Sequence, residues 1–213
     1  MTNPGPLAGF TRRVRRGLVL QSRGFLVRCL PTADNVRGPF YRPGAPFRER
    51  LCPTDEPGQP LEMTGLVTGS PSCRPVIGAV LDVWQTNARG FYSNMLGWGD
   101  PRNRKTFHLR GRVRTDDEGQ YRFVSILPGR YPLWPLTRPR HVHVIVTHEQ
   151  YPPFVTQIFF EGDSYLRWDP WAKESLVVKL QESNRTPDGR AQLTGRFDIV
   201  LPRPSSDPQR ESL

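Results

Sequence analysis

Glycine and proline interrupt this chain so often that long regular segments have little room. The 213 residues include 19 glycines and 23 prolines, together about a fifth of the chain. Proline lacks a backbone donor and both residues favour turns, so this density argues against long helices. The sequence therefore predicts short strands joined by turns, and its length suits one domain with a substantial core.

Alternation of apolar and polar residues marks where these strands should lie. Candidate strands fall at residues 61–69, 75–85, 110–115, 120–126, 141–148, 155–160 and 193–202. In the second of them, one face should carry Ile77, Ala79, Leu81 and Val83. Turn residues at Asp116–Gly119 separate two of the others. This spacing predicts an all-β fold, a single β-sandwich domain with little helix.

Three regions of the chain differ in composition. They are a basic tail at 1–28, the sandwich domain at 29–202 and a polar C-terminal tail at 203–213. Residues 29–60 are rich in Pro, Gly and Arg, yet they include Phe40, Tyr41 and Phe47, which need burial. We therefore expect an irregular N-terminal segment that wraps the domain. A turn near Leu166–Ala172 is the best helix candidate.

The charge pattern bears on partners and location. The formal net charge is +10, but only Thr11–Arg16 forms a basic run and no nucleic-acid motif accompanies it, so we expect no nucleic-acid partner. No apolar stretch approaches the roughly 18 residues that a membrane span requires, so no membrane association is expected. Arg12 and Arg13 resemble the start of an export signal, but Gln21–Arg23 break the apolar stretch that follows. We expect a cytoplasmic protein, with export left open.

Three cysteines, Cys29, Cys52 and Cys73, lack the spacing of a zinc site. An odd count cannot pair completely within one chain. Two arrangements stay open: three reduced thiols, which we prefer, or one disulfide, for which Cys29 and Cys73 are the best pair.

His141 and His143 are the most specific chemical feature of the sequence. They alternate with Val142, Val144 and Val146, which are expected to face the core. Side chains at i and i+2 of a strand share a face and stand about 7 Å apart, which suits two imidazoles that chelate one metal. The competing interpretation is a pair of histidines on a solvent-facing surface.

Tyr92 and Tyr131 each follow a strand or turn, where sandwiches place functional loops. Read singly, each tyrosine is more typical of packing than of metal ligation. Whether they are metal ligands has to be judged from the segments around them.

Those segments together resemble a known family. The stretches are GPFY at 38–41, PVIGAVLDVWQTNARGFYSN at 75–94, RGRVRTDDEGQYRFVSILPGRYP at 110–132, RPRHVHV at 138–144 and TQIFF at 156–160. In this order they resemble the intradiol ring-cleavage dioxygenases, the group of catechol 1,2-dioxygenase and protocatechuate 3,4-dioxygenase. The resemblance covers over half the chain.

The resemblance implies an iron(III) site with two tyrosinates and two histidines. The ligands that it assigns are Tyr92, Tyr131, His141 and His143. Tyr92 matches the tyrosine that stays bound, and Tyr131 matches the one that leaves the metal when substrate binds and takes a proton. Arg138 matches an arginine beside the substrate ring, and Gln157 matches a glutamine behind the ligands. Anionic oxygen suits a hard ferric ion better than thiolate does.

The implied reaction inserts both atoms of O₂ into a catechol-type aromatic diol. The ring opens between the two hydroxylated carbons to a cis,cis-muconate-type diacid. The resemblance does not decide which catechol is the substrate, and it leaves assembly into a homo-oligomer open. The competing hypothesis is a non-catalytic, transthyretin-like or peptidase-regulatory-like β-sandwich that acts as a binding module. Such a module would not explain why the four ligand positions occur together.

Overall fold

The structure is a computed structural model that describes residues 29–95, 106–133, 136–186 and 189–203. The basic tail expected at 1–28 lies outside the described residues, as does nearly all of the C-terminal tail expected at 203–213.

Short strands dominate the described chain. They are β1 (Pro60–Gly69), β2 (Arg74–Pro75), β3 (Val80–Gln85), β4 (Arg110–Arg114), β5 (Gln120–Ile126), β6 (Tyr131–Leu133), β7 (Leu136–Arg138), β8 (His141–His148), β9 (Tyr151–Phe160), β10 (Val177–Val178), β11 (Gln181–Arg185), β12 (Ala191–Arg196) and β13 (Ile199–Leu201). Two single-turn 3₁₀ helices, η1 (Leu166–Trp168) and η2 (Glu174–Leu176), are the helical elements of these residues. The predicted all-β fold is confirmed. None of the described helices has the length and apolarity to cross a membrane.

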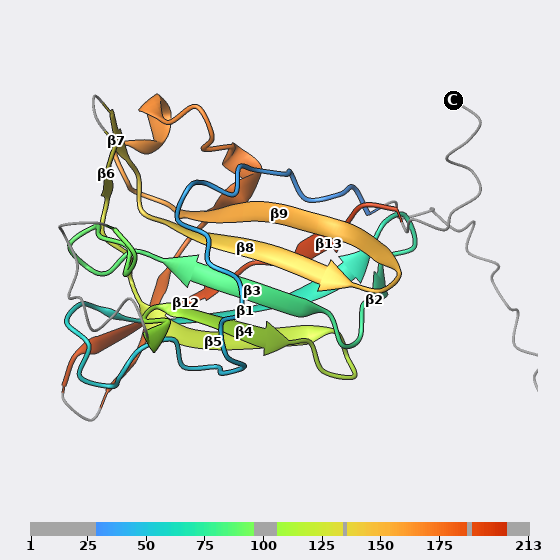
Figure 1. The fold of residues 1–213 in the computed structure, drawn as a ribbon, viewed down its shortest axis with the longest axis horizontal. Coiled ribbons are helices and arrows are strands. Elements are labelled where there is room, and N and C mark those ends of the chain that lie inside the picture. Colours follow the sequence, from blue (N-terminus) through green and yellow to red (C-terminus); the bar gives the residue numbers. More distant parts are fainter. Residues whose placement is uncertain (1–28, 96–105, 134–135, 187–188, 204–213) are drawn as a thin grey trace, which may run out of the picture.

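Most strands form two facing sheets, seen as two layers in Figure 1, and β6 and β7 form a separate two-stranded sheet in which Tyr131 pairs with Arg138. One sheet has the order β10-β9-β8-β3-β4, and the other is built around β1, which pairs with β12, β13, β5 and β2. Side chains such as Leu81, Val144, Leu61 and Met63 fill the space between them and are fully buried. The valines that alternate with His141 and His143 lie in this core, as the alternation predicted.

The N-terminal segment wraps the outer face of the five-stranded sheet. In Figure 1 it is the blue chain that crosses β9, β8 and β3. Backbone hydrogen bonds of 2.9 Å hold it, from the Asn35 N–H to the Val155 carbonyl and from the Arg48 N–H to the Arg112 carbonyl. The expected wrap is therefore present.

Two apolar side chains are not buried as expected. Ile77 is 54% exposed because Gly78, with φ +74°, turns the chain before β3 begins at Val80. Phe47 is 51% exposed, and the guanidinium of Arg112 lies 4.3 Å from the centre of its ring. A cation over the ring replaces the apolar burial that the sequence suggested.

The cysteines differ from the arrangement that we preferred. Cys29 and Cys73 form a disulfide, with Cα atoms 5.3 Å apart, so the expectation of three reduced thiols was wrong. The bond ties the start of the wrap to the turn between β1 and β2. Cys52 is a buried free thiol, and burial raises its pKa to about 11.

Candidate metal centre

The two histidines lie on the outer face of the five-stranded sheet, beneath the wrap. His143 on β8 pairs in register with Trp84 on β3 and with Gln157 on β9. His141 is 1% exposed and His143 3% exposed, so the solvent-facing alternative is wrong. The outer face is buried here because the wrap covers it.

Three potential donor atoms converge on one point. The Tyr92 hydroxyl oxygen lies 3.0 Å from Nε2 of His141 and 3.0 Å from Nε2 of His143. The two Nε2 atoms are 3.2 Å apart. Metal bonds of about 2.1 Å that open at roughly 90–110° place neighbouring donor atoms about 3.0–3.4 Å apart. The triangle therefore has the dimensions of one side of a metal coordination shell.

The neutral state of the two histidines favours a bound cation at this point. Nδ1 of His141 donates to the Pro139 carbonyl at 2.7 Å, so its Nε2 presents a lone pair. Burial, with the charge of Arg138, lowers the pKa of His141 to about 3, and burial with the neighbouring His141 lowers the pKa of His143 well below its usual value. Both imidazoles are therefore neutral at pH 7. Two neutral imidazole nitrogens and a phenol oxygen that face one point are donors that one metal ion can share.

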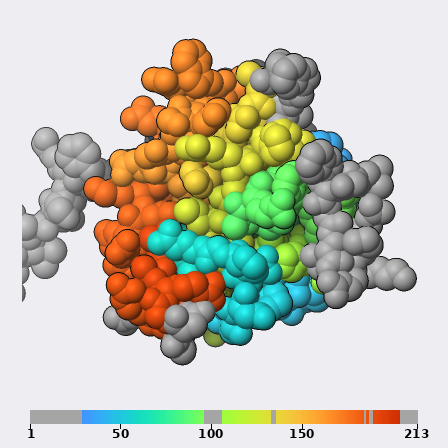
Figure 2. All heavy atoms as spheres, turned by 90° about the vertical axis from the view of Figure 1, so that its left-hand side faces the viewer, coloured from blue at the N-terminus to red at the C-terminus, as the bar shows by residue number. Residues whose placement is uncertain are grey.

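A tight turn after β3 delivers Tyr92 to the histidines. The Asn87 side-chain oxygen accepts hydrogen bonds of 3.0 Å from the N–H groups of Arg89 and Phe91. Gly90, with φ +87°, lies so close to the Arg130 carbonyl that a Cβ atom there would meet it at 1.9 Å. The turn thus packs directly against the residue that precedes Tyr131. Figure 2 views this end of the molecule, where the green chain after β3 meets the yellow chain around β8.

Tyr131 completes the aromatic surroundings of the donors. Its ring packs edge-on against Tyr92, with centroids 5.4 Å apart, and against Phe40 at 5.5 Å. Its hydroxyl forms no hydrogen bond with another described residue, and burial raises the pKa of its phenol. Tyr131 therefore lies beside the triangle of the Tyr92 oxygen and the two histidine Nε2 atoms, but its hydroxyl is not part of that triangle.

Arg138 is buried next to His141 and is held by three groups. Its Nη2 donates to the Gln157 side-chain oxygen at 2.9 Å, and its Nε donates to the Asp169 carboxylate at 2.8 Å. The Trp171 ring lies 4.7 Å from the guanidinium carbon. Arg138 Nη1 then lies 3.4 Å from His141 Nε2, so a positive charge faces the point where the donors meet.

Asp169 and Trp171 are site residues that sequence reasoning missed. They follow η1, in a region where the sequence predicted only a turn. Neither lies in a stretch that carries the family resemblance, so no sequence signal pointed to them. Gln157, in contrast, is where the resemblance placed it, and its amide nitrogen also donates to the Val36 carbonyl of the wrap at 2.6 Å.

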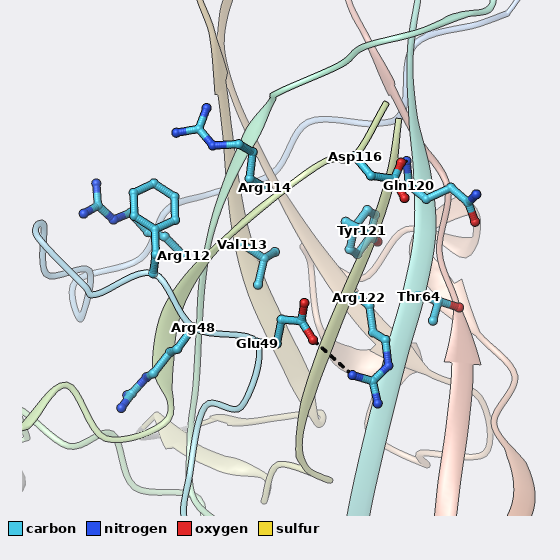
Figure 3. A pocket seen from close by; sticks show the side chains of 11 residues that line it. Arg48, Glu49, Thr64, Arg112, Val113, Arg114, Asp116, Gln120, Tyr121 and Arg122 are labelled. Carbon is cyan, nitrogen blue, oxygen red and sulfur yellow. Dashed lines mark hydrogen bonds and ion pairs between the residues drawn. The ribbon is translucent and has the colours of Figure 1, made fainter. Parts of the chain in front are cut away.

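The donor set fits a hard trivalent metal. Within the described ranges, no three His, Cys, Asp or Glu side chains form a potential metal cluster, so this centre depends on tyrosine oxygens. Two imidazoles and two phenols suit iron(III), which prefers anionic oxygen. The surface pocket of Figure 3 is lined by Arg48, Arg112 and Tyr121 among others, and it includes none of Tyr92, Tyr131, His141 and His143.

Comparisons with known proteins identify relatives of this chain. A sequence model of the family described as Dioxygenase matches residues 36–203. The intradiol ring-cleavage dioxygenase prcA of Aspergillus niger is 31% identical over 205 residues, covering 84% of this chain and 62% of that protein. Chlorocatechol 1,2-dioxygenase of Rhodococcus opacus is 31% identical over 193 residues, covering 80% of this chain and 72% of that protein.

A solved structure extends the agreement to the fold. It is the dioxygenase domain of a dioxygenase carbohydrate-binding protein fusion from Streptomyces sp. SirexAA-E. That domain is 31% identical, with a TM-score of 0.68, over 81% of this chain and 99% of its own.

The chain therefore belongs to the intradiol ring-cleavage dioxygenase family. The resemblance in the motifs is confirmed, and the alternative of an unrelated, non-catalytic sandwich finds no support. The chain spans less than two thirds of the length of the Aspergillus relative.

Proposed function

We propose that this chain is an iron(III) intradiol dioxygenase. It would insert both atoms of O₂ into a catechol-type aromatic diol and cleave between the two hydroxylated carbons, giving a cis,cis-muconate-type diacid. The observation that carries the proposal is the convergence of the Tyr92 oxygen and the two histidine Nε2 atoms within 3.0–3.2 Å.

The proposed ligands are Tyr92, Tyr131, His141 and His143. Bound iron(III) would supply a Lewis acid that holds both oxygens of the diol and makes its ring reactive toward O₂. Tyr92, within hydrogen-bond distance of both histidines, would be the ligand that stays. Tyr131, which lies beside the triangle, would be the ligand that gives way to the diol and accepts a proton from its incoming hydroxyl.

Arg138 would stabilise negative charge on the bound diol. Its Nη1 faces the donor atoms while Asp169 and Gln157 fix the rest of the guanidinium, so the charge is already in place before substrate arrives. Gln157 connects Arg138 to the wrap and would support catalysis by holding that arginine. The wrap excludes water from the face on which the diol binds.

An aromatic 1,2-diol suits a metal site of this kind, since it can present two adjacent oxygens to one metal. The Rhodococcus relative is named for chlorocatechol, and other matching relatives are named for catechol and hydroxyquinol. We propose a substrate from this class of catechols for the present chain.

The assignment is tested by the colour of the iron-loaded protein. Iron(III) bound to tyrosinate should give a broad visible charge-transfer band, and Tyr92→Phe should shift or abolish it and greatly lower turnover. Tyr121→Phe is the matched control, because Tyr121 is equally buried but donates to the Phe197 carbonyl in the core. That variant should keep the band of the wild type.

Two results would count against the assignment. A wild-type protein that stays colourless after iron loading would rule out tyrosinate ligands. A band that survives unchanged in Tyr92→Phe would rule out Tyr92 as a ligand.

A further inference from the structure

A second arginine, Arg110, is buried on the same face as the candidate metal centre, and the proposed reaction assigns it no part. Arg110 begins β4 and pairs in register with Trp84, which pairs in turn with His143. Residues paired across neighbouring strands share a face, so these three side chains form a row across the sheet. Arg110 is 1% exposed, which is unusual for a charged residue.

The hydrogen bonds of Arg110 lead to the segment that carries Tyr92. Its Nε donates to the Ser93 hydroxyl at 3.1 Å and its Nη2 to the Asn94 side-chain oxygen at 2.7 Å. Asn94 donates in turn to the Phe40 carbonyl at 3.4 Å, and the Phe40 ring stacks on Tyr92 at 4.8 Å. These contacts fix both the backbone after Tyr92 and one face of its ring.

Arg110 keeps its charge in this buried position. Burial lowers the pKa of Arg110 to about 10, so the group is still charged at neutral pH, and the nearby charge of Asp82 on β3 favours the charged form. The hydrogen bonds of its guanidinium go to the neutral side chains of Ser93 and Asn94, so its contacts orient the chain after Tyr92.

We infer that Arg110 is a positioning residue for Tyr92: it holds the Ser93–Asn94 segment and, through Asn94 and Phe40, fixes the orientation of the Tyr92 ring. This inference rests on the proposed iron(III) site. It adds a residue on β4, whereas Arg138 lies on β7, and one that does not contact the substrate in the scheme above.

Three variants of the iron-loaded full chain test the role of Arg110. Arg110→Met removes both the charge and the hydrogen bonds, and Arg110→Lys keeps the charge alone. Arg112→Met is the matched control, because Arg112 lies two residues along the same strand and lines the surface pocket of Figure 3. The readouts are the position of the tyrosinate band and the rate at which a chelator removes iron.

The expected results follow the hydrogen bonds of Arg110. Arg110→Met should shift or broaden the band, because the Tyr92 ring is no longer held in one orientation, and should speed iron removal about 10- to 100-fold. Arg110→Lys should also lose iron faster than wild type, because one ammonium cannot reproduce the two hydrogen bonds that the guanidinium donates to Ser93 and Asn94. Arg112→Met should match wild type in both readouts.

Wild-type band position and iron removal in a folded Arg110→Met protein would overturn the inference. If that variant does not fold, Arg110→Lys decides, and a wild-type rate of iron removal in it would have the same effect. A wild-type protein that forms no band at all contradicts the iron site itself, which distinguishes the failure of the proposed function from the failure of this inference.

Discussion

His143 shows how single residues set the geometry of the centre. Its ring is stacked on Trp84, with centroids 4.7 Å apart and planes 2° from parallel. On the other side, a Cβ atom added to Gly38 would lie 3.2 Å from Cε1 of the imidazole. An imidazole confined in this way has little freedom to rotate, so Nε2 points to the Tyr92 oxygen before any metal binds.

The buried histidines should make the iron-free protein sensitive to acid. The pKa of His141 is about 3 in the folded chain and about 6.5 in an unfolded one, so between these pH values the unfolded state binds more protons. The free energy of unfolding should therefore fall as pH falls, by about 2 kcal/mol for His141 between pH 7 and pH 5. Urea unfolding of iron-free wild type and His141→Gln at both pH values measures this.

His141→Gln should lose less stability than wild type over the same pH step, because it no longer has this proton to bind. Equal losses in the two proteins would show that His141 is not the source of the acid sensitivity.

Sequence reasoning reached the site residues to different extents. Strand alternation predicted that His141 and His143 share a face, while Tyr92, Tyr131, Arg138 and Gln157 depended on the family resemblance. Asp169 could not be predicted, because it lies 31 positions after Arg138 and meets it only when the chain folds back over the sheet. Arg110 looked like one of many scattered arginines, and only the fold shows that it is buried and paired with Trp84.

At the scale of elements, the wrap is what converts an exposed sheet face into a site. It brings Gly38 against His143, Phe40 against Tyr92 and Val36 against Gln157. The sequence predicted that residues 29–60 wrap the domain, because aromatic side chains there needed burial. It could not predict that Phe47 would be an exception, since the arginines that cover its ring come from β4.

Gly38→Ala tests how closely the wrap must approach the sheet. Gly38 has φ +70°, so alanine should cost about 1–2 kcal/mol of stability and should also press on His143. Gly162→Ala is the matched control, because Gly162 has φ +81° with nothing within 4 Å of an added Cβ. Urea unfolding and chelator removal of iron are measured for both.

Both glycine variants should lose similar stability, and only Gly38→Ala should release iron faster than wild type. Equal iron release from the two variants would mean that the approach of the wrap to His143 does not matter for the metal.

At the scale of the whole molecule, the sandwich core and the site lie on opposite faces of one sheet. Val142, Val144 and Val146 pack into the core, while His141 and His143 between them face the wrap. The core beneath one face and the wrap over the other hold the proposed ligands, which come from three separate segments: Tyr92, Tyr131 and the two histidines of β8. Alternation along one strand could be read from the sequence, but the meeting of the three segments required the fold.

Intradiol cleavage at this centre is the activity that we propose for the molecule as a whole. The most direct test is a reaction of the iron-loaded chain with a panel of catechols under ¹⁸O₂, followed by mass spectrometry of the products. We expect, for at least one catechol, a cis,cis-muconate-type diacid in which both atoms of the O₂ are incorporated. A ring opened beside the diol rather than between its hydroxylated carbons, or no ring opening with any catechol by a protein that carries the tyrosinate band, would contradict it.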